Sequence, residues 1–306
     1  GDADIAGRCF APAWPQARLV CGLEWGDDAT VVDLGTGLSL VTTTDFFPPV
    51  VDDPYCWGRI AAANALSDVY AMGATPVSAL NLLAWPTDEV EDSVAVEVLR
   101  GGSSATDEAG CFLAGGHSIQ DATPKYGLAV TGVVETEHLM RNDAARPGDP
   151  MSITKPLGLG VLNNRHKQTA MPIDEAIAVM SALNKEASRA AVAARITAAT
   201  DITGFGLLGH LYKMARASGV SAVVDAASVP ILEGAVAAVE AGCVPGGTIR
   251  NLEWVQPHLQ SSVSETQLIL LADAQTSGGL LLAGEIPGAT VIGHFEEPSG
   301  AALIVR

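Results

Sequence analysis

The apolar positions in the first half of the chain follow two different periods. The compact runs "ATVVDL" and "LSLVTTTDFF", joined by the turn "GTG" at 35–37, predict two consecutive strands. Residues 58–72 are apolar on almost every face and predict a buried helix. The other elements predicted for this half are a strand over 76–85, an amphipathic helix near 88–109, a short buried run "CFLAGGHS" that ends in glycines, and a strand over 126–135.

A new set of elements begins after a polar break. The segment "NDAARPGDP" at 142–150 contains Pro and Gly and is the best linker candidate, so we predict one domain over 1–148 and another over 149–306. The pattern indicates two α+β domains. The elements predicted beyond the linker are a strand-like start in "MSITKPLGLGVL", a long Ala-rich helix from about 173 to 196, a turn and helix in "DITGFGLLGHLYKMARASG", and strands in "SAVVDAASV", "TQLILLADAQTSGGLLLA" and "AALIVR".

Charge and cysteine usage narrow the classes of partner and compartment. The 35 acidic and 17 basic residues give a net charge of −18, which argues against nucleic acid or an anionic membrane as partner. A nucleotide remains compatible, because cations can bridge its phosphates to carboxylates. No apolar run approaches the ~18–20 residues of a spanning helix, and the start "GDADIAGRC" lacks the order of a signal peptide. The 5 cysteines contain no CxxC pair, which favours reduced thiols in a cytoplasmic protein.

One carboxylate draws attention because it lies in the middle of the apolar helix. Asp68 in "NALSDVYAMG" is costly to bury unless its pKa shifts or it binds a cation. Asp27, Asp28, Asp45 and Asp201 also border apolar runs, next to Gly, Thr or Asn. Such acids could share a Mg²⁺–nucleotide site. The alternative is that they cap helices or begin turns, and that Asp68 makes a buried hydrogen bond.

Two glycine-containing segments could contact phosphate. "DITGFGLLGH" has the form of a strand end, a glycine turn and a helix start, which can bind an anion. "AGGHS" at 114–118 offers backbone amides or forms an ordinary tight turn, and His117 alone is typical of a packed histidine. Neither a P-loop nor a GxGxxG fingerprint occurs. The residues by themselves predict a metal-dependent nucleotide or phosphate enzyme without a standard loop.

Together these segments resemble the selenophosphate synthetases (selenide, water dikinases), of the aminoimidazole ribonucleotide synthetase-like superfamily. They follow the family's order from about residue 22 to the C-terminus. "TTDFF" and "NALSD" are shared in weaker form with relatives such as thiamine-monophosphate kinase, whereas "VPGGTIRN" and "DAQTSGGLL" point to the selenophosphate branch. The resemblance rests on "GDDATVV", "TTDFFPPVVDDPYCWGRIAAANALSDVYAMGATP", "LAGGHSI", "YGLAVTGVV", "TKPLGLGVL", "TDITGFGLLGH", "VPGGTIRN" and "DAQTSGGLLLA".

The resemblance implies a fold, a reaction and a set of site residues. The fold is two-domain α+β, with an N-terminal sheet domain that binds ATP and dimerises and a C-terminal α/β domain. The reaction converts ATP, selenide and water into selenophosphate, AMP and orthophosphate, with Mg²⁺ and, as a further candidate, K⁺. Asp28, Asp68 and Asp201 match the family's metal-binding aspartates. The positions that match nucleotide contacts are Asp27, Thr43, Asp45, Asn64, Asp68, Gly116, His117 and Ser118.

The resemblance fails at the N-terminal loop, where the family carries Cys or selenocysteine followed three residues later by Lys. The first lysine here is Lys125, and Cys9 lies in "AGRCFAP" without a glycine-rich surround. Counted back from Asp28, the expected loop falls just before Gly1. A trimmed chain, a loop left out of the sequence and a natural variant without the nucleophile all stay open, so no catalytic residue is assigned. Residues 1–306 are expected to bind ATP with Mg²⁺ but to make no selenophosphate.

Two other functions stay open at this point. A related superfamily kinase such as thiamine-monophosphate kinase would differ in its product, ADP instead of AMP. A catalytically silent homologue would bind nucleotide and act as a regulatory dimer. A homodimer is expected in either case, because strands 38–46, 76–85 and 126–135 are apolar on both faces and one face needs a second copy to cover it.

Overall fold

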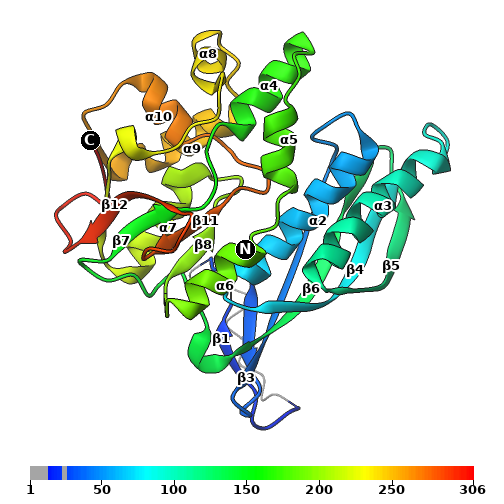
Figure 1. Ribbon diagram of the computed structural model, residues 1–306, viewed down its shortest axis with the longest axis horizontal. Coiled ribbons are helices and arrows are strands. Elements are labelled where there is room, and N and C mark those ends of the chain that lie inside the picture. Colours follow the sequence, from blue (N-terminus) through cyan, green and yellow to red (C-terminus); the bar gives the residue numbers. More distant parts are fainter. Residues whose placement is uncertain (1–12, 23–25) are drawn as a thin grey trace.

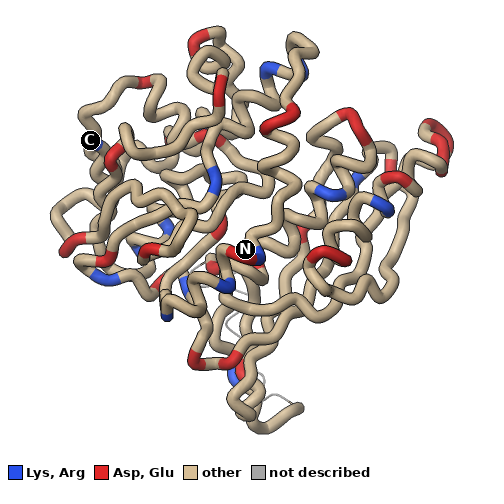
Figure 2. The backbone as a smooth tube through the Cα atoms, in the orientation of Figure 1, with Lys and Arg blue, Asp and Glu red and all other residues tan. Residues whose placement is uncertain are grey.

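A computed structural model describes residues 13–22 and 26–306 of the chain; Cys9 lies outside them. The described part forms two mixed sheets with helices packed against them, one sheet from each half of the sequence (Figure 1). The predicted α+β class is confirmed. Asp and Glu are spread along the whole backbone and outnumber Lys and Arg (Figure 2). Among the described helices, none combines the length and apolar content needed to cross a membrane.

The first sheet contains six described strands in the order β1-β2-β3-β6-β4-β5. Neighbouring strands are antiparallel, except that β4 and β5 run parallel. The long pairing of β3 with β6, from Leu38 opposite Glu135 to Phe47 opposite Tyr126, forms the middle of this sheet. The bounds are β1 Arg18–Cys21, β2 Thr30–Asp33, β3 Leu38–Phe47, β4 Thr75–Trp85, β5 Phe112–Gln120 and β6 Lys125–Glu135.

Helices α2 (Pro54–Ala71) and α3 (Asp92–Ala109) lie side by side over one face of this sheet (Figure 1). They approach so closely that a Cβ on Gly58 of α2 would lie 1.9 Å from the backbone oxygen of Val98 on α3. Because any side chain would clash there, glycine is needed for this packing. Helix α2 begins four residues before the predicted start at 58, because Pro54 occupies its first turn and Asp53 caps it.

The second sheet contains seven strands among the described residues, in the order β10-β13-β9-β12-β7-β11-β8. Its strands are β7 Pro150–Ile153, β8 Ala199–Asp201, β9 Ser221–Val224, β10 Leu259–Ser261, β11 Leu280–Ala283, β12 Thr290–Glu296 and β13 Leu303–Val305. The helices of the second half are α4 Leu159–Thr169, α5 Asp174–Ser181, α6 Lys185–Ala193, α7 Gly206–Ser218, α8 Ala235–Glu240, α9 Gly246–Val255 and α10 Glu265–Leu271, and the short 3-10 helices are η1 Thr136–His138, η2 Ala226–Ser228 and η3 Gln256–His258.

The long Ala-rich helix predicted over 173–196 is wrong, because the chain breaks it into α5 and α6. At the break, the side chain of Asn184 donates hydrogen bonds to Ser67 Oγ at 2.9 Å and to the backbone oxygen of Gly278 at 2.9 Å. Lys155 Nζ donates to the backbone oxygen of Ala182 at 2.7 Å. These contacts from distant segments replace the helical ladder over residues 182–184.

The strand predicted throughout "TQLILLADAQTSGGLLLA" is also wrong in its first part. Residues 265–271 form helix α10, and only the later part forms β11. Ser264 and Gln267 make a reciprocal capping box, in which Gln267 N donates to Ser264 Oγ at 3.3 Å and Ser264 N donates to Gln267 Oε1 at 3.1 Å. The Ser-x-x-Gln spacing is therefore a helix-start signal that the apolar pattern obscured.

The segment "CFLAGGHS" is not the short buried run predicted. Only Cys111 is buried; residues 112–118 belong to β5, an edge strand that pairs with β4 alone among the described strands and is exposed at nearly every position. Gly116 has a φ of +150°, and a Cβ there would lie 2.2 Å from the backbone oxygen of Asn81. The glycine thus lets the edge strand approach β4 closely at an irregular point of the pairing.

The core does not divide as sharply as the sheets do. The strands of the first sheet end at residue 135 and those of the second begin at residue 150. The hydrophobic cluster under the first sheet nevertheless includes Leu159, Met180 and Ala235 from α4, α5 and α8. The division into domains 1–148 and 149–306 therefore stays a prediction.

The first sheet exposes apolar side chains on the face away from α2 and α3. Phe46 is 50% exposed and Leu80 is 46% exposed. Their registers place them on one face, because Leu80 lies opposite Ala129 and Ala129 lies opposite Thr44, two residues from Phe46. We call this the outer face of the first sheet.

Candidate metal and nucleotide site

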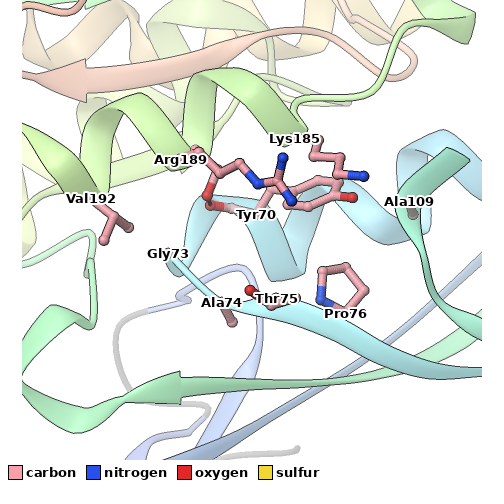
Figure 3. A pocket seen from close by; sticks show the side chains of 10 residues that line it. Tyr70, Gly73, Ala74, Thr75, Pro76, Ala109, Lys185, Arg189 and Val192 are labelled. Carbon is pink, nitrogen blue, oxygen red and sulfur yellow. Dashed lines mark hydrogen bonds between the residues drawn. The ribbon is translucent and has the colours of Figure 1, made fainter.

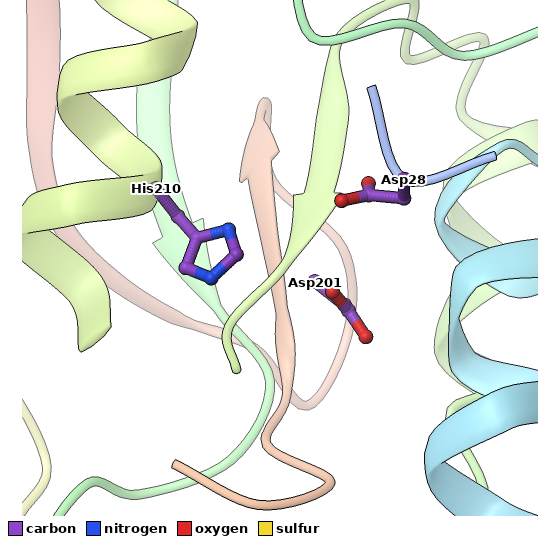
Figure 4. Close-up of side chains that lie close together, drawn as sticks. All are labelled: Asp28, Asp201 and His210. Carbon is purple, nitrogen blue, oxygen red and sulfur yellow. The ribbon is translucent and has the colours of Figure 1, made fainter. Parts of the chain in front are cut away.

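Three carboxylates from distant segments meet between the two sheets. Asp201 ends β8, Asp28 precedes β2, and Asp68 lies on α2. An oxygen of Asp28, an oxygen of Asp201 and a ring nitrogen of His210 all lie within 4.8 Å of one another (Figure 4). Burial raises the pKa of Asp68 well above its usual value, and the negative charges of Asp201 and Asp28 raise it further. We call Asp28, Asp68 and Asp201 the carboxylate cluster.

The carboxylate cluster is only partly supplied with hydrogen-bond donors. Thr200 Oγ1 donates to Asp28 Oδ1 at 2.8 Å, and Thr43 Oγ1 donates to Asp68 Oδ2 at 2.5 Å. Oδ2 of Asp28 and Oδ2 of Asp201 are buried and have no hydrogen-bond partner among the described residues. Such an atom costs about 1–3 kcal/mol when nothing satisfies it. Because Mg²⁺ prefers carboxylate oxygens, these orphaned atoms fit a bound divalent cation.

The raised pKa values of the cluster also fit a bound divalent cation. Burial raises the pKa of Asp201 to about 6. Burial and the charge of Asp201 raise the pKa of Asp28 well above its usual value. Three acids that repel one another in a buried position are stabilised by a cation, which lowers their pKa values again. The site therefore favours a divalent cation over three free carboxylates.

A second polar group lies beside the cluster on the inner face of β3. Asn64 Nδ2 donates to Asp45 Oδ2, and the backbone N of Ser277 donates to Asn64 Oδ1 at 2.8 Å. Thr43, which holds Asp68, is two residues from Asp45 on the same strand. The structure thus brings together Thr43, Asp45, Asn64 and Asp68, which the sequence alone could only relate through a family resemblance.

A cavity of about 540 Å³ lies next to the carboxylate cluster. Its size is in the range of about 300–1,000 Å³ that is typical of small-molecule sites. Asp27 and Asp28 line it, and one oxygen of Asp27 accepts a hydrogen bond from the backbone N of Asn142 at 2.9 Å. Thr42, Thr44 and Ala129 also line it, so the cavity reaches the outer face of the first sheet.

Gly116, His117 and Ser118 are not part of this arrangement within one chain. They lie on β5, and strands β4 and β6 separate β5 from β3. Adjacent strands are about 4.8 Å apart, so three steps place this segment roughly 14 Å from β3 along the sheet. Their predicted contact with nucleotide stays a prediction.

Sequence reasoning missed three polar residues beside the cluster. Thr200 holds Asp28, as described above. Lys155 Nζ donates to the backbone oxygen of Ser277 at 2.9 Å, and burial lowers the pKa of Lys155 to about 7. His210 Nε2 accepts from the backbone N of Thr203 at 3.1 Å, and burial lowers the His210 pKa to about 3, so its ring is neutral. Lys155 lies in "TKPLG", and Thr200 and His210 lie in "TDITGFGLLGH". The signal that could have found them is a polar side chain next to an apolar run.

Both halves of the chain match known families. Residues 26–134 match the family described as AIR synthase related protein, N-terminal domain, and residues 146–306 match AIR synthase related protein, C-terminal domain. A selenide, water dikinase of Caldanaerobacter subterraneus subsp. tengcongensis is 49% identical over 274 residues, which cover 88% of this chain and 79% of the relative. The chain belongs to the selenide, water dikinase family.

Other similar proteins fall into two groups. The selenide, water dikinase of Bordetella bronchiseptica is 49% identical over 299 residues, 94% of this chain and 87% of that protein. Thiamine-monophosphate kinase from Aquifex aeolicus has a TM-score of 0.68 at 19% identity, covering 91% of this chain and 90% of its own. Hydrogenase maturation protein HypE in complex with ATP has a TM-score of 0.64 at 19% identity, covering 87% of this chain and 81% of its own. The second group shows the shared fold alone, and the first confirms the resemblance to selenide, water dikinases.

Proposed function

We propose that the function of this protein is the synthesis of selenophosphate, a reaction that also needs the family's Cys-containing and Lys-containing N-terminal loop. ATP, selenide and water are the substrates, and AMP and orthophosphate are released with the product. Relatives named selenide, water dikinase, at 44–49% identity over most of the chain, support this reaction over that of a thiamine-monophosphate kinase. The structural observation that carries the proposal is the carboxylate cluster, with its two buried oxygens that lack a donor.

The cluster would hold Mg²⁺ through Asp28, Asp68 and Asp201. When bound, Mg²⁺ neutralises phosphate charge and stabilises the charge that develops during phosphoryl transfer. The chain itself orients the carboxylates: Thr200 fixes Asp28 and Thr43 fixes Asp68. Such preorientation is effective because phosphoryl transfer depends mostly on positioning and electrostatics. A further K⁺ ion stays a prediction.

The nucleotide would occupy the 540 Å³ cavity, which Asp27 and Thr43 line, and Thr43 connects it to Asp45 and Asn64 on the inner face of β3. We propose a homodimer formed through the outer face of the first sheet, because apolar Phe46 and Leu80 are exposed there and the cavity reaches the same face. If residues 116–118 contact the nucleotide, they do so from the second copy. Sedimentation at micromolar concentration should give a dimer, and a monomer would contradict this part of the proposal.

We propose a cytoplasmic location from the state of the thiols. Cys21, Cys56, Cys111 and Cys243 are free among the described residues. Free thiols support a reducing compartment such as the cytoplasm.

Phosphorus NMR under anaerobic conditions tests the reaction. ATP, Mg²⁺ and selenide are mixed with residues 1–306, and separately with the same chain carrying the family's Cys-containing and Lys-containing loop ahead of Gly1. We expect selenophosphate, AMP and orthophosphate from the loop-bearing chain and none from residues 1–306. Absence of selenophosphate from both would support a silent homologue, and formation of ADP alone would support the kinase alternative.

A further inference from the structure

A separate cavity of about 160 Å³ lies between the end of α2, the start of β4 and α6 (Figure 3). Tyr70, Lys185 and Arg189 are among the residues that line it. Tyr70 is two residues from Asp68 on α2, which rotates its side chain by about 200° to the opposite side of the helix. The cavity is therefore distinct from the carboxylate cluster and from the proposed nucleotide site.

Two cationic side chains face this cavity from one helix. Lys185 and Arg189 are four residues apart on α6, so they lie on the same side of it, one turn apart. Lys185 Nζ donates one hydrogen bond, at 2.7 Å, to the backbone oxygen of Glu108, and two of its three N–H groups remain. Arg189 pairs with Glu186 at 2.9 Å, but both side chains are exposed and such a surface pair is weak.

Tyr70 supplies a third donor that the chain does not use. Its side chain is only 3% exposed, and its hydroxyl has no hydrogen-bond partner among the described residues. A buried tyrosine hydroxyl normally finds a partner. Figure 3 shows the Tyr70 ring beside the side chains of Lys185 and Arg189 at the cavity. An orphaned donor beside a cavity that two cations also line indicates a missing acceptor, and the cations favour an acceptor with negative charge.

The walls of the cavity are held in place before any ligand arrives. Ser188 Oγ donates to the backbone oxygen of Tyr70 at 2.7 Å, which ties α6 to the last turn of α2. Asn184, just before α6, donates a hydrogen bond to Ser67, which also lies on α2. Because α6 is fixed at both points, binding would require little reordering of the backbone.

We propose that this cavity, which we call the α6 pocket, binds a small dianion of the orthophosphate type. Arginine and lysine are the residues that recognise phosphate oxygens, and the tyrosine hydroxyl can donate to a third oxygen. The cavity of about 160 Å³ has room for an ion of the size of phosphate.

Titration calorimetry of inorganic phosphate into the nucleotide-free chain, in EDTA and low salt, tests the proposal. Without a metal the carboxylate cluster repels phosphate, so saturable binding reports on the α6 pocket. We expect one site of millimolar affinity or better. The double variant Lys185→Met, Arg189→Gln should bind at least about tenfold more weakly, and Tyr70→Phe about threefold more weakly.

Arg100→Gln is the matched control. Arg100 is 67% exposed and pairs with Glu97 at 2.7 Å, as Arg189 does with Glu186, but it lies on α3 and does not line the α6 pocket. Its phosphate affinity should equal that of the unaltered chain. Absence of saturable binding in the unaltered chain, or equal binding by the double variant, overturns the proposal. If the double variant does not show a folded melting transition, the single variant Arg189→Gln, at an exposed position, is tested instead. Its phosphate affinity should fall by about threefold or more, and an unchanged affinity overturns the proposal.

Discussion

Asp273 and Asp201 are both buried carboxylates, and burial raises the pKa of each to about 6. Asp273 is fully surrounded by donors from its own chain. Two of them are backbone N–H groups at the start of α4, and two are side chains. The donors are Gly160 N at 2.9 Å, Val161 N at 3.2 Å, Thr248 Oγ1 at 2.9 Å and Gln275 Nε2 at 3.0 Å.

Asp201 lies in the opposite situation. Its Oδ2 has no partner among the described residues, and it faces Asp28, which has an orphaned oxygen of its own. The difference teaches how to separate two uses of a buried acid. A carboxylate that the chain supplies with donors on both oxygens stabilises the fold, whereas repelling carboxylates, two of which leave a buried oxygen without a donor, fit an external cation. Variants of the two residues should therefore behave differently.

Metal removal should have the largest effect on ligand binding. In the unaltered chain, replacing Mg²⁺ by EDTA should weaken ATP binding at least about a hundredfold, roughly 2.7 kcal/mol, because bare carboxylates repel the phosphates. The variant Asp273→Asn should show the same dependence on Mg²⁺. Titration calorimetry measures both, and an ATP affinity that is unchanged by EDTA would contradict the assignment of the cluster.

Folding stability should depend more on Asp273 than on Asp201, the reverse of what is expected for ATP binding. Asp273→Ala should lower the free energy of unfolding by about 3 kcal/mol, because four donors lose their acceptor. Asp201→Asn, measured in EDTA, should leave the free energy of unfolding equal or raise it, because like-charge repulsion is removed. Urea denaturation checks both variants. A larger loss for Asp201→Asn than for Asp273→Ala would break the comparison.

A smaller effect should appear in the pH dependence of stability. The pKa of Asp273 is raised in the folded state from 3.8 to about 6, so its contribution to stability is greatest below pH 3.8 and is lost as the pH rises through 6. Between pH 5 and pH 7 the unaltered chain should therefore lose about 1 kcal/mol relative to Asp273→Asn. Urea denaturation of both proteins at the two pH values measures this, and a relative gain of stability with rising pH would contradict the sign.

The sequence is informative where local patterns decide the structure. Strands β2, β3, β4 and β6, the helix around Asp68 and the turn and helix after Asp201 are predictable from apolar spacing and turn residues, whereas the same spacing does not predict β1 and predicts a buried run in place of β5. The unusual place of Asp68 within an apolar helix also indicates by itself a cation or a buried hydrogen bond. The structure shows a hydrogen bond from Thr43 and the proximity of two further acids.

What the sequence could not show depends on contacts between distant segments. The break between α5 and α6 arises from hydrogen bonds that Asn184 makes with Ser67 and Gly278, far away in the sequence. The support of Asp28 by Thr200 joins residues 172 positions apart. No local pattern contains such pairs, so these parts of the fold and the site had to come from the structure.

The central claim is that the carboxylate cluster binds the metal–nucleotide complex, and one pair of variants tests it most directly. Asp68→Asn and Asp273→Asn each remove one buried charge with little change in volume. ATP affinity in Mg²⁺, measured by titration calorimetry on proteins shown to be folded by circular dichroism, should fall beyond detection for Asp68→Asn and stay within about threefold for Asp273→Asn. An Asp68→Asn affinity within about threefold of the unaltered chain, under ~1 kcal/mol, would contradict the claim.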